Sequence, residues 1–509
     1  MKRAFLHLAT PLFCLAVALL TFFCFPGHTW LQQDSQIYAP ILEHERDPSA
    51  LRNDILVQHP HVAYTLYDEI ALALRAVTGL PFRDVLAAEQ IATRALGIWG
   101  LLMLAEAFGL AMLPAMSVAA ICSLGAMITG PQVLTIEYEP TPRAFAVPLL
   151  VCGMGLAARS RYWAAGIAAA VAFVIHAPTT LPFLAGFVLL ARRARWTAYL
   201  PVGVALGVVV LIAGPGQEQQ HFFAVLTSSQ EMLQRMRTAY CWVSMWPLAT
   251  IVRHLAIFAV LCGACARLWQ KLGLELRVWL LVLPALGILS MPLSWMLLDQ
   301  GGWSLIPQLQ PMRALLFVTL AMQFATAAAG FQAPAWWEAA FWFSCAYYPA
   351  CQSPLAIALG IATALLRARY ALVAALAAFF VIPTIGGVVN YPRLHTPELA
   401  QLSEWARANT SRDAVFLFPD AGHGLQPGIF RTEALRAVYV DWKGGGQVNY
   451  LAELGEDWWF RWQQTVARGF HPQDVPKYAG LGVQYIVLKK RTADAPLFEN
   501  AAFAVYRTR

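Results

Sequence analysis

The succession of long apolar runs up to about residue 389 constrains this chain more than any other feature of its sequence. Hydrophobic residues make up 59% of the chain and charged residues 13%, about half the charged share of an average soluble domain. A water-soluble fold cannot cover so much apolar surface, whereas a bilayer accommodates helices that satisfy their own backbone hydrogen bonds. The sequence therefore predicts an α-helical polytopic membrane protein.

Basic residues between the apolar runs predict the orientation of the chain. Cytoplasmic loops retain Lys and Arg, so Lys2 and Arg3 place the N-terminus in the cytoplasm. The runs give about 13 transmembrane helices, including neighbouring spans near 162–176 and 178–191. With this count, basic residues recur in the cytoplasmic loops, among them Arg159, Arg267 and Arg367. Membrane orientation thus explains the net charge of +7, and we expect no nucleic-acid partner.

The same reasoning predicts two domains in a bacterial inner (plasma) membrane protein. Residues 1–390 form the transmembrane domain, with a long first periplasmic loop at 25–90, and residues 391–509 form a small periplasmic α/β domain. In the loop, residues 67–80 have helical apolar spacing, which is typical of a helix at the membrane interface. In the tail, Thr396 and Pro397 fit the start of a helix, and "AVFLFP", "AVYVDW", "YIVL" and "FAVYR" are typical of strands. We expect the tryptophans of the tail to pack onto the membrane interface: Trp458, Trp459 and Trp462.

Carboxylates in two outer loops are the first candidates for chemistry. Asp34 follows the first span by about ten residues, where it could accept a proton from a hydroxyl or position a metal. The alternative is an ordinary acid in a polar loop. The hairpin "TIEYEPTPR" contains Glu137, Glu139 and Arg143, which could bind a diphosphate through a metal and a bidentate contact. The alternative there is an ion-paired loop cap.

Further candidates lie at the ends of spans and in the tail. His176 ends a span, where it either serves a function or contacts headgroups or terminal carbonyls. Arg313 opposes the positive-inside bias, so it requires an anionic phosphate or an acid partner such as Asp299. Asp441 and Lys443 precede three glycines, which would let a ligand approach the backbone, unless this is only a charged turn.

Several segments together resemble the GT-C glycosyltransferase superfamily. They are "DSQIY" in the first loop, "PTPRAFAVPL" opening a span, "HAP" closing another, and the tail pattern "AVFLFP…RAVYVDWKGG…YIVL…FAVYR". The architecture is similar over nearly the whole chain, and the tail resembles uncharacterised bacterial proteins grouped with the superfamily. Several members have paired acids in the first loop, whereas Asp34 is followed here by Ser35.

The resemblance implies an inverting transfer of a sugar from a polyprenyl-phosphate donor to a glycan, lipid or protein acceptor on the periplasmic face. Asp34 would be the catalytic base, assisted by Glu137 and Glu139, and Asp34 with Glu139 could hold a divalent cation, Mg²⁺ or Mn²⁺. Substrate would be bound by Arg143, His176, Arg313, Asp441 and Lys443. Two other hypotheses are a transporter or flippase of lipid-linked glycans and a non-catalytic membrane assembly protein.

Overall fold

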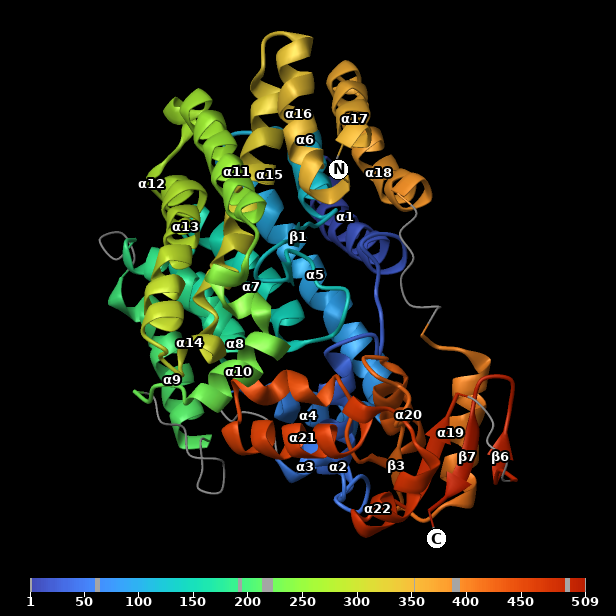
Figure 1. Ribbon diagram of the computed structural model, residues 1–509. Helices are drawn as coiled ribbons and strands as arrows, with labels where there is room; N and C mark the ends of the chain where they lie inside the picture. Colours follow the sequence, from blue (N-terminus) through green and yellow to red (C-terminus); the bar gives the residue numbers. More distant parts are fainter. Residues whose placement is uncertain are drawn as a thin grey trace.

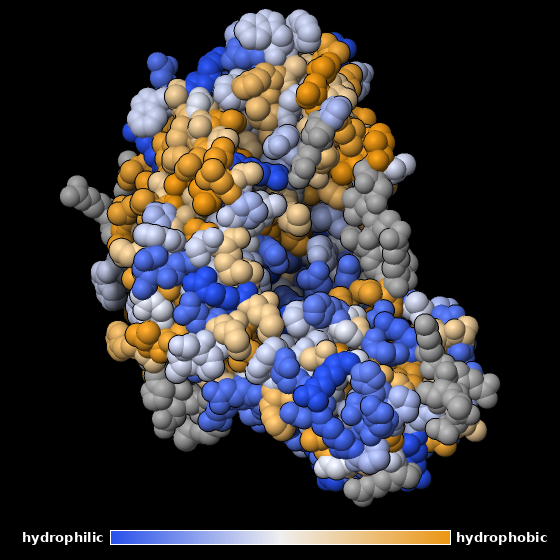
Figure 2. All heavy atoms as spheres, in the orientation of Figure 1, coloured by the Kyte–Doolittle hydropathy of each residue, from blue (hydrophilic) through white to orange (hydrophobic). Residues whose placement is uncertain are grey.

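The computed structural model describes residues 2–59, 65–190, 195–212, 223–351, 353–386, 394–489 and 495–508. A bundle of long helices occupies the upper part of Figure 1, and a smaller unit of strands and short helices lies below it. Apolar side chains gather on the bundle, and hydrophilic side chains gather on the lower unit (Figure 2). The predicted boundary near residue 390 falls outside the described residues.

The bundle confirms the predicted polytopic helical fold. Within the described ranges, five helical stretches are long and apolar enough to cross a membrane, and six shorter apolar helices accompany them. The helices of the bundle are α1 (Lys2–Phe23), α5 (Phe82–Ala107), α6 (Met112–Cys122), α7 (Pro142–Ala158), α8 (Tyr162–Val188), α9 (Leu200–Ile212), α11 (Leu248–Arg267), α12 (Leu274–Arg277), α13 (Leu283–Ser294), α15 (Leu315–Gln332), α16 (Trp336–Cys351), α17 (Ser353–Leu366) and α18 (Ala371–Gly386).

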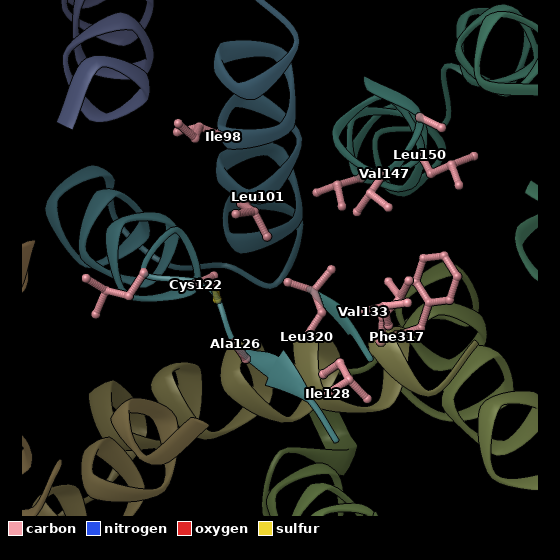
Figure 3. Close-up of a cluster of buried hydrophobic side chains, with 14 of the residues drawn as sticks. Ile98, Leu101, Cys122, Ala126, Ile128, Val133, Val147, Leu150, Phe317 and Leu320 are labelled. Atoms are coloured by element: carbon pink, nitrogen blue, oxygen red, sulfur yellow. The ribbon is translucent and has the colours of Figure 1, made fainter. Parts of the chain in front are cut away.

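Small residues let the central helices of the bundle approach closely. A Cβ on Gly155 of α7 would lie 2.4 Å from the carbonyl oxygen of Gly100 on α5, so only glycine fits at this crossing. The apolar core around the crossing includes Leu101, Val147 and Leu320, from α5, α7 and α15 (Figure 3). A hairpin of β1 (Met127–Ile128) and β2 (Val133–Leu134) enters the same core.

Helix α8 reverses its direction at His176, which has non-helical backbone angles. A Cβ on Gly153 would lie 3.6 Å from the carbonyl oxygen of Ala165 and 3.2 Å from the ring of Phe183. In a straight helix Ala165 and Phe183 would be about 27 Å apart, so the two halves of α8 run side by side. This geometry agrees with the spans predicted near 162–176 and 178–191, although residue 191 lies outside the described residues.

Proline and the first outer loop stabilise this reversal. Pro178 has no N–H to donate to the carbonyl of Val174, and this carbonyl instead accepts a hydrogen bond from Leu66 N at 2.6 Å. The carbonyl of Ile175 accepts from Thr65 Oγ1 at 2.7 Å. The turn of α8 is therefore held against the loop that follows α1.

Outside the bundle lie α2 (Ser35–Arg46), α3 (Ile55–Gln58), α4 (Tyr67–Thr78), α10 (Ser228–Arg237) and α14 (Ile306–Leu309). The helix predicted at 67–80 is α4, which ends at Thr78 and is capped by Gly79, whose φ is 70°. Helix α5 starts at Phe82, within the segment 25–90 that the sequence assigned to the first loop, because Phe82, Val85 and Leu86 are buried and extend the helix before the continuous apolar run begins.

The C-terminal unit contains a five-stranded mixed sheet in the order β4-β3-β5-β7-β6. Its elements are α19 (Pro397–Asn409), β3 (Val415–Leu417), α20 (Gln426–Ala434), β4 (Ala437–Val438), α21 (Ala452–Gln464), α22 (Val475–Gly480), β5 (Tyr485–Leu488), β6 (Phe498–Glu499) and β7 (Ala504–Arg507). Strands β4, β3 and β5 are parallel to one another, and β7 runs antiparallel to both of its neighbours, β5 and β6. As predicted, the Thr396 side chain caps α19 by accepting from Leu399 N.

The first loop and the C-terminal unit share a hydrophobic core. Ile37 and Leu56 of the loop belong to the same buried cluster as Trp458 and Trp462 of α21. The prediction that these two tryptophans face the membrane interface is therefore wrong, because their rings are buried and stacked on one another. The shared core brings the residues that follow Trp30 to those near residue 443.

Candidate active site

One cavity of about 450 Å³ collects most of the residues that the sequence singled out. Asp34, Arg143, His176, Arg313 and Lys443 all line it. They come from the N-cap of α2, the first turn of α7, the reversal in α8, the 3-10 turn η7 (Pro311–Ala314) before α15, and the loop before the 3-10 turn η8 (Gly444–Asn449). Residues far apart in the sequence thus meet where the helical bundle and the C-terminal unit contact the first loop.

Asp34 is paired with Lys443 across this cavity. The Lys443 Nζ lies 2.5 Å from Asp34 Oδ1, and the side chains are 17% and 43% exposed. Burial alone would raise the pKa of Asp34, but Lys443, Arg143 and Arg313 outweigh burial and hold that pKa at about 2. In this arrangement Asp34 is a carboxylate whose basicity is suppressed by its cationic partner.

Glu139 is buried directly beneath Asp34. Its Oε1 accepts from Gln32 N at 2.8 Å, Gln33 N at 2.6 Å and Ser35 Oγ at 2.9 Å, and its Oε2 accepts from Asp34 N at 2.6 Å and Ser35 N at 3.3 Å. The carboxylate therefore satisfies the otherwise unpaired N–H groups at the start of α2. These bonds engage both oxygens and favour a positioning role for Glu139, whose predicted catalytic role stays a prediction.

Glu137 forms an ion pair with Arg143. The Arg143 Nε lies 2.6 Å from Glu137 Oε1, both side chains are 8% exposed, and the same oxygen accepts from Leu134 N. Glu137 does not line the 450 Å³ cavity but lines an adjoining one of about 330 Å³. Glu137 thus orients Arg143, whose guanidinium reaches the larger cavity, and its predicted catalytic role stays a prediction.

His176 and Arg313 both line the cavity, but their side chains make different contacts. The His176 Nδ1 accepts from Thr179 N at 3.3 Å, so the ring caps the returning half of α8. The proposed partner of Arg313, Asp299, instead accepts from Ser244 N at 3.2 Å. Within the described residues the Arg313 guanidinium has no carboxylate partner and lies 5.7 Å from the ring of Tyr240. Arg313 therefore forms no close ion pair in those parts of the chain, although its charge acts on Asp34 across the cavity.

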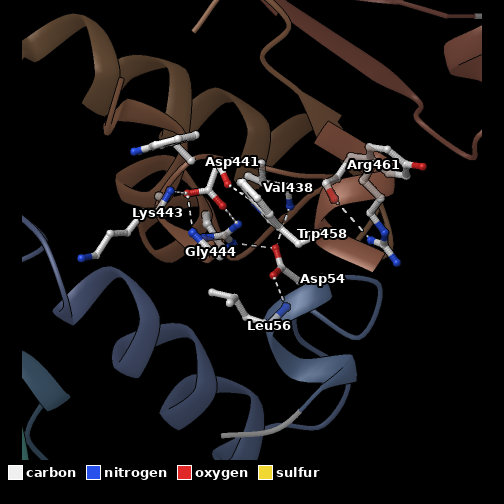
Figure 4. Close-up of polar contacts among 12 residues, drawn as sticks. Asp54, Leu56, Val438, Asp441, Lys443, Gly444, Trp458 and Arg461 are labelled. Carbon is white, nitrogen blue, oxygen red and sulfur yellow. Dashed lines mark hydrogen bonds and ion pairs between the residues drawn. The ribbon is translucent and has the colours of Figure 1, made fainter. Parts of the chain in front are cut away.

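Asp441 belongs to a buried charge cluster behind the cavity (Figure 4). Arg431 Nε lies 2.7 Å from Asp54 Oδ2 and Arg431 Nη2 lies 2.5 Å from Asp441 Oδ1, and all three side chains are fully buried. The second oxygen of Asp441 accepts from the backbone N–H of Lys443 at 3.2 Å. Asp441 therefore holds the loop that presents Lys443 and does not line the cavity, and its predicted contact with substrate stays a prediction.

The glycines after Lys443 also differ from expectation. A Cβ on Gly445 would lie 2.3 Å from the ring of Trp458, so this glycine permits packing of the loop on α21. Gly446 is the glycine of the three that lines the cavity.

Arg237 is a cavity residue that the sequence analysis missed. Its guanidinium lies 3.7 Å above the ring of Trp442 and donates to the Trp442 carbonyl at 2.5 Å. Burial lowers the pKa of Arg237 to about 10. In the predicted orientation Arg237 lies in an outer loop and, like Arg313, opposes the positive-inside bias, and this signal could have identified it. Tyr240 and Tyr450 complete this wall.

A divalent cation does not fit the residues proposed to hold it. Both Glu139 oxygens are occupied by hydrogen-bond donors, Asp34 Oδ1 is occupied by Lys443, and Arg143 and Arg313 act on Asp34 as cations. Hard cations require several oxygen ligands around one point. No group of three His, Cys, Asp or Glu side chains that could hold a metal occurs in the described part of the chain.

Comparisons with known proteins found one family that matches part of the C-terminal unit and solved structures that match nearly the whole chain. A family described as a domain of unknown function (DUF6798) matches residues 397–465. None of the curated proteins matches this chain.

Two similar solved structures are the arabinofuranosyltransferase AftD from Mycobacteria and ArnT from Cupriavidus metallidurans in the apo state. AftD is 16% identical with a TM-score of 0.44, and the match covers 94% of this chain but 35% of AftD, so this chain spans about a third of that protein. ArnT is 13% identical with a TM-score of 0.44, and the match covers 100% of this chain and 99% of ArnT. Because both TM-scores are below 0.5, function has to be argued from the geometry of the cavity.

Proposed function

We propose that this chain is a GT-C-type membrane glycosyltransferase that transfers a sugar from a polyprenyl-phosphate-linked donor to an acceptor on the periplasmic face. The observation that carries the proposal is the lining of the 450 Å³ cavity, where the carboxylate of Asp34 lies among several cations. One of these cations, Arg313, has no carboxylate partner within the described residues. Such a cavity suits a reaction that takes a proton at one point and releases a phosphate at another.

The cations support binding of the donor phosphate. Guanidinium groups donate two parallel hydrogen bonds to a phosphate, and a leaving phosphate accumulates negative charge as its bond to the sugar breaks. Arg313 forms no close ion pair in the described residues, and Arg143 is held by its ion pair with Glu137. His176 and Lys443 line the same space. The residues would therefore stabilise the departing phosphate without requiring a metal.

The carboxylate of Asp34 in the cavity could act as the general base. An acceptor hydroxyl would lose its proton to the Asp34 carboxylate while its oxygen forms a bond to the anomeric carbon of the donor. The bond from that carbon to the phosphate oxygen would break on the opposite face, and the polyprenyl phosphate would leave with the electron pair. This course inverts the configuration of the anomeric carbon, and Glu139 fixes the backbone from which Asp34 acts.

Purified protein supplied with polyprenyl-phosphate-linked sugars and candidate acceptors tests this proposal. We expect Asp34→Asn to bind the donor and to transfer sugar at least about a hundredfold more slowly than the wild type, since positioned proton transfer contributes about 10²–10⁴-fold. Asp457→Asn, which removes an acid from an ion pair outside the cavity, is the matched control. Full transfer by Asp34→Asn would show that Asp34 is not the base.

A non-catalytic lipid-binding protein is the second candidate, because Lys443 suppresses the basicity of Asp34 in this structure. Donor binding by the wild type without transfer to any acceptor would favour it. Movement of the lipid-linked sugar across a vesicle membrane would instead favour the flippase hypothesis.

A further inference from the structure

Lys443 and Asp34 are anchored through their backbones while their side chains meet in the cavity. The N–H of Lys443 is held by Asp441, and the N–H of Asp34 is held by Glu139. A lysine ammonium is carried on a flexible four-carbon stem, so it can change partners while both backbones stay in place. The exposed fraction of Asp34, 43%, shows that one side of the pair is open to the cavity.

The proposed reaction makes incompatible demands on this pair. An ammonium 2.5 Å from Asp34 Oδ1 opposes proton uptake by the carboxylate, yet the same ammonium lines the cavity that would receive the phosphate. Arg143 already has Glu137 as a partner, whereas Arg313 has no acid partner among the described residues. An arriving phosphate would therefore find Arg313 available and would compete with Asp34 for Lys443.

We propose that Lys443 is an exchangeable partner, which holds Asp34 when the donor is absent and moves to the donor phosphate when the donor binds, thereby freeing Asp34 as the base. This inference rests on the proposed function and adds to it a coupling between donor binding and base activation. The enzyme would be unable to activate an acceptor, including water, until the phosphate is in place.

Other ionisable groups around Asp34 also influence its pKa before and after the exchange. They are Arg143 on α7, Arg313 on η7, Tyr38 on α2, Glu139 and Tyr138 in the hairpin after β2, Tyr240 after α10, and Tyr450 after η8. Arg143 and Arg313 act on Asp34 in the same direction as Lys443. Their contribution remains when Lys443 leaves, so exchange raises the pKa of Asp34 without removing every cation from its surroundings.

The pH dependence of transfer tests the exchange, because kcat/KM reports the base in the free enzyme and kcat reports the base in the donor complex. In the wild type we expect kcat/KM to stay flat down to about pH 4. The acid limb of kcat should lie about one to three pH units above the acid limb of kcat/KM, which is the range by which a nearby opposite charge lowers an acid's pKa. In Lys443→Met, the acid limb of kcat/KM should rise to meet that of kcat, and the limb of kcat should stay where it is in the wild type.

Several outcomes distinguish this inference from its rivals. Coincident acid limbs in the wild type would overturn the exchange, and so would a Lys443→Met variant in which both limbs rise together, since Lys443 would then remain beside Asp34 in the complex. Lys443→Arg should restore the separation, and Lys477→Met, a change outside the cavity, should leave both limbs unchanged. If the wild type transfers no sugar at any pH, the proposed function itself fails, whereas transfer with coincident limbs removes this inference alone.

Discussion

Two charge clusters, which meet at the loop from Asp441 to Lys443, differ in how their charges are satisfied. The closed cluster consists of Asp54, Arg431 and Asp441, which are fully buried and paired with one another. The open cluster consists of Asp34, Lys443 and Arg313, which line a cavity and include a guanidinium without an acid partner in the described residues. The comparison teaches that burial of charge alone does not single out a candidate site, whereas a cation without a close ion pair beside a cavity does.

Breaking the closed cluster should give the largest effect on stability. Arg431→Met would leave the buried carboxylates of Asp54 and Asp441 without their cation, and removing one partner of a buried ion pair costs about 3–5 kcal/mol. Thermal unfolding of the purified protein measures this loss. Arg412→Met, which removes an exposed pair with Asp47, is the control and should cost no more than about 1 kcal/mol. Equal losses in the two variants would refute the distinction.

The support beneath the open cluster should matter next. Glu139→Gln removes the negative charge that accepts four backbone N–H groups, and we expect a loss of about 2 kcal/mol in the free energy of unfolding, within the range for unsatisfied buried donors. Transfer activity should fall as well, because Asp34 loses its anchor. Glu106→Gln, in an ion pair with Arg159 at the far end of α5, should change neither quantity appreciably. Unaltered unfolding in Glu139→Gln would contradict its positioning role.

Removing the unpaired cation should affect binding and leave stability unchanged. Arg313→Met deletes no ion pair within the described residues, so the unfolding temperature should stay close to that of the wild type. Affinity for polyprenyl phosphate should fall about tenfold, equivalent to ~1.4 kcal/mol. Binding titrations compare it with Arg235→Met, which lies in the same outer region but pairs with Glu231. Unchanged affinity would mean that the phosphate does not reach Arg313.

The smallest effect concerns acid stability. The pKa of Asp34 in the folded protein, about 2, is below its ordinary value of 3.8, so the Asp34–Lys443 pair stabilises the fold above about pH 4 and loses this contribution as pH falls towards 2. Because Asp34 is 43% exposed, solvent screening limits the effect to at most about 1 kcal/mol. Unfolding curves of the wild type and Lys443→Met should differ above pH 4 and converge near pH 2. A constant difference at all pH values would contradict this account.

Much of the fold follows from local sequence signals. The cap at Thr396, the helix at 67–78 and strands β3, β5 and β7 were predictable because each depends on neighbouring residues. The convergence of Asp34, Arg143, His176, Arg313 and Lys443 on one cavity was also within reach. These residues share one predicted face of the membrane, and their charges have no place in an apolar span.

The individual roles within the site were not predictable. Glu139 and Asp441 are carboxylic acids in loops, as a catalytic acid would be. Only their long-range contacts with Asp34 and Arg431 reveal which groups they hold in place. The burial of Trp458 likewise depends on the first loop, more than 400 residues away in the sequence, through Ile37. Local patterns contain no information about such partners.

The distance along the chain between Asp34 and Lys443 has a consequence for biosynthesis. The two residues that meet across the cavity are separated by 409 positions. At about 5–20 residues per second, a ribosome needs about 20–80 s after Asp34 to reach Lys443. By the end of that interval the helices up to α18 have been synthesised, but the wall of the cavity that contains Lys443 is still missing. A chain whose synthesis stops early therefore lacks an assembled site.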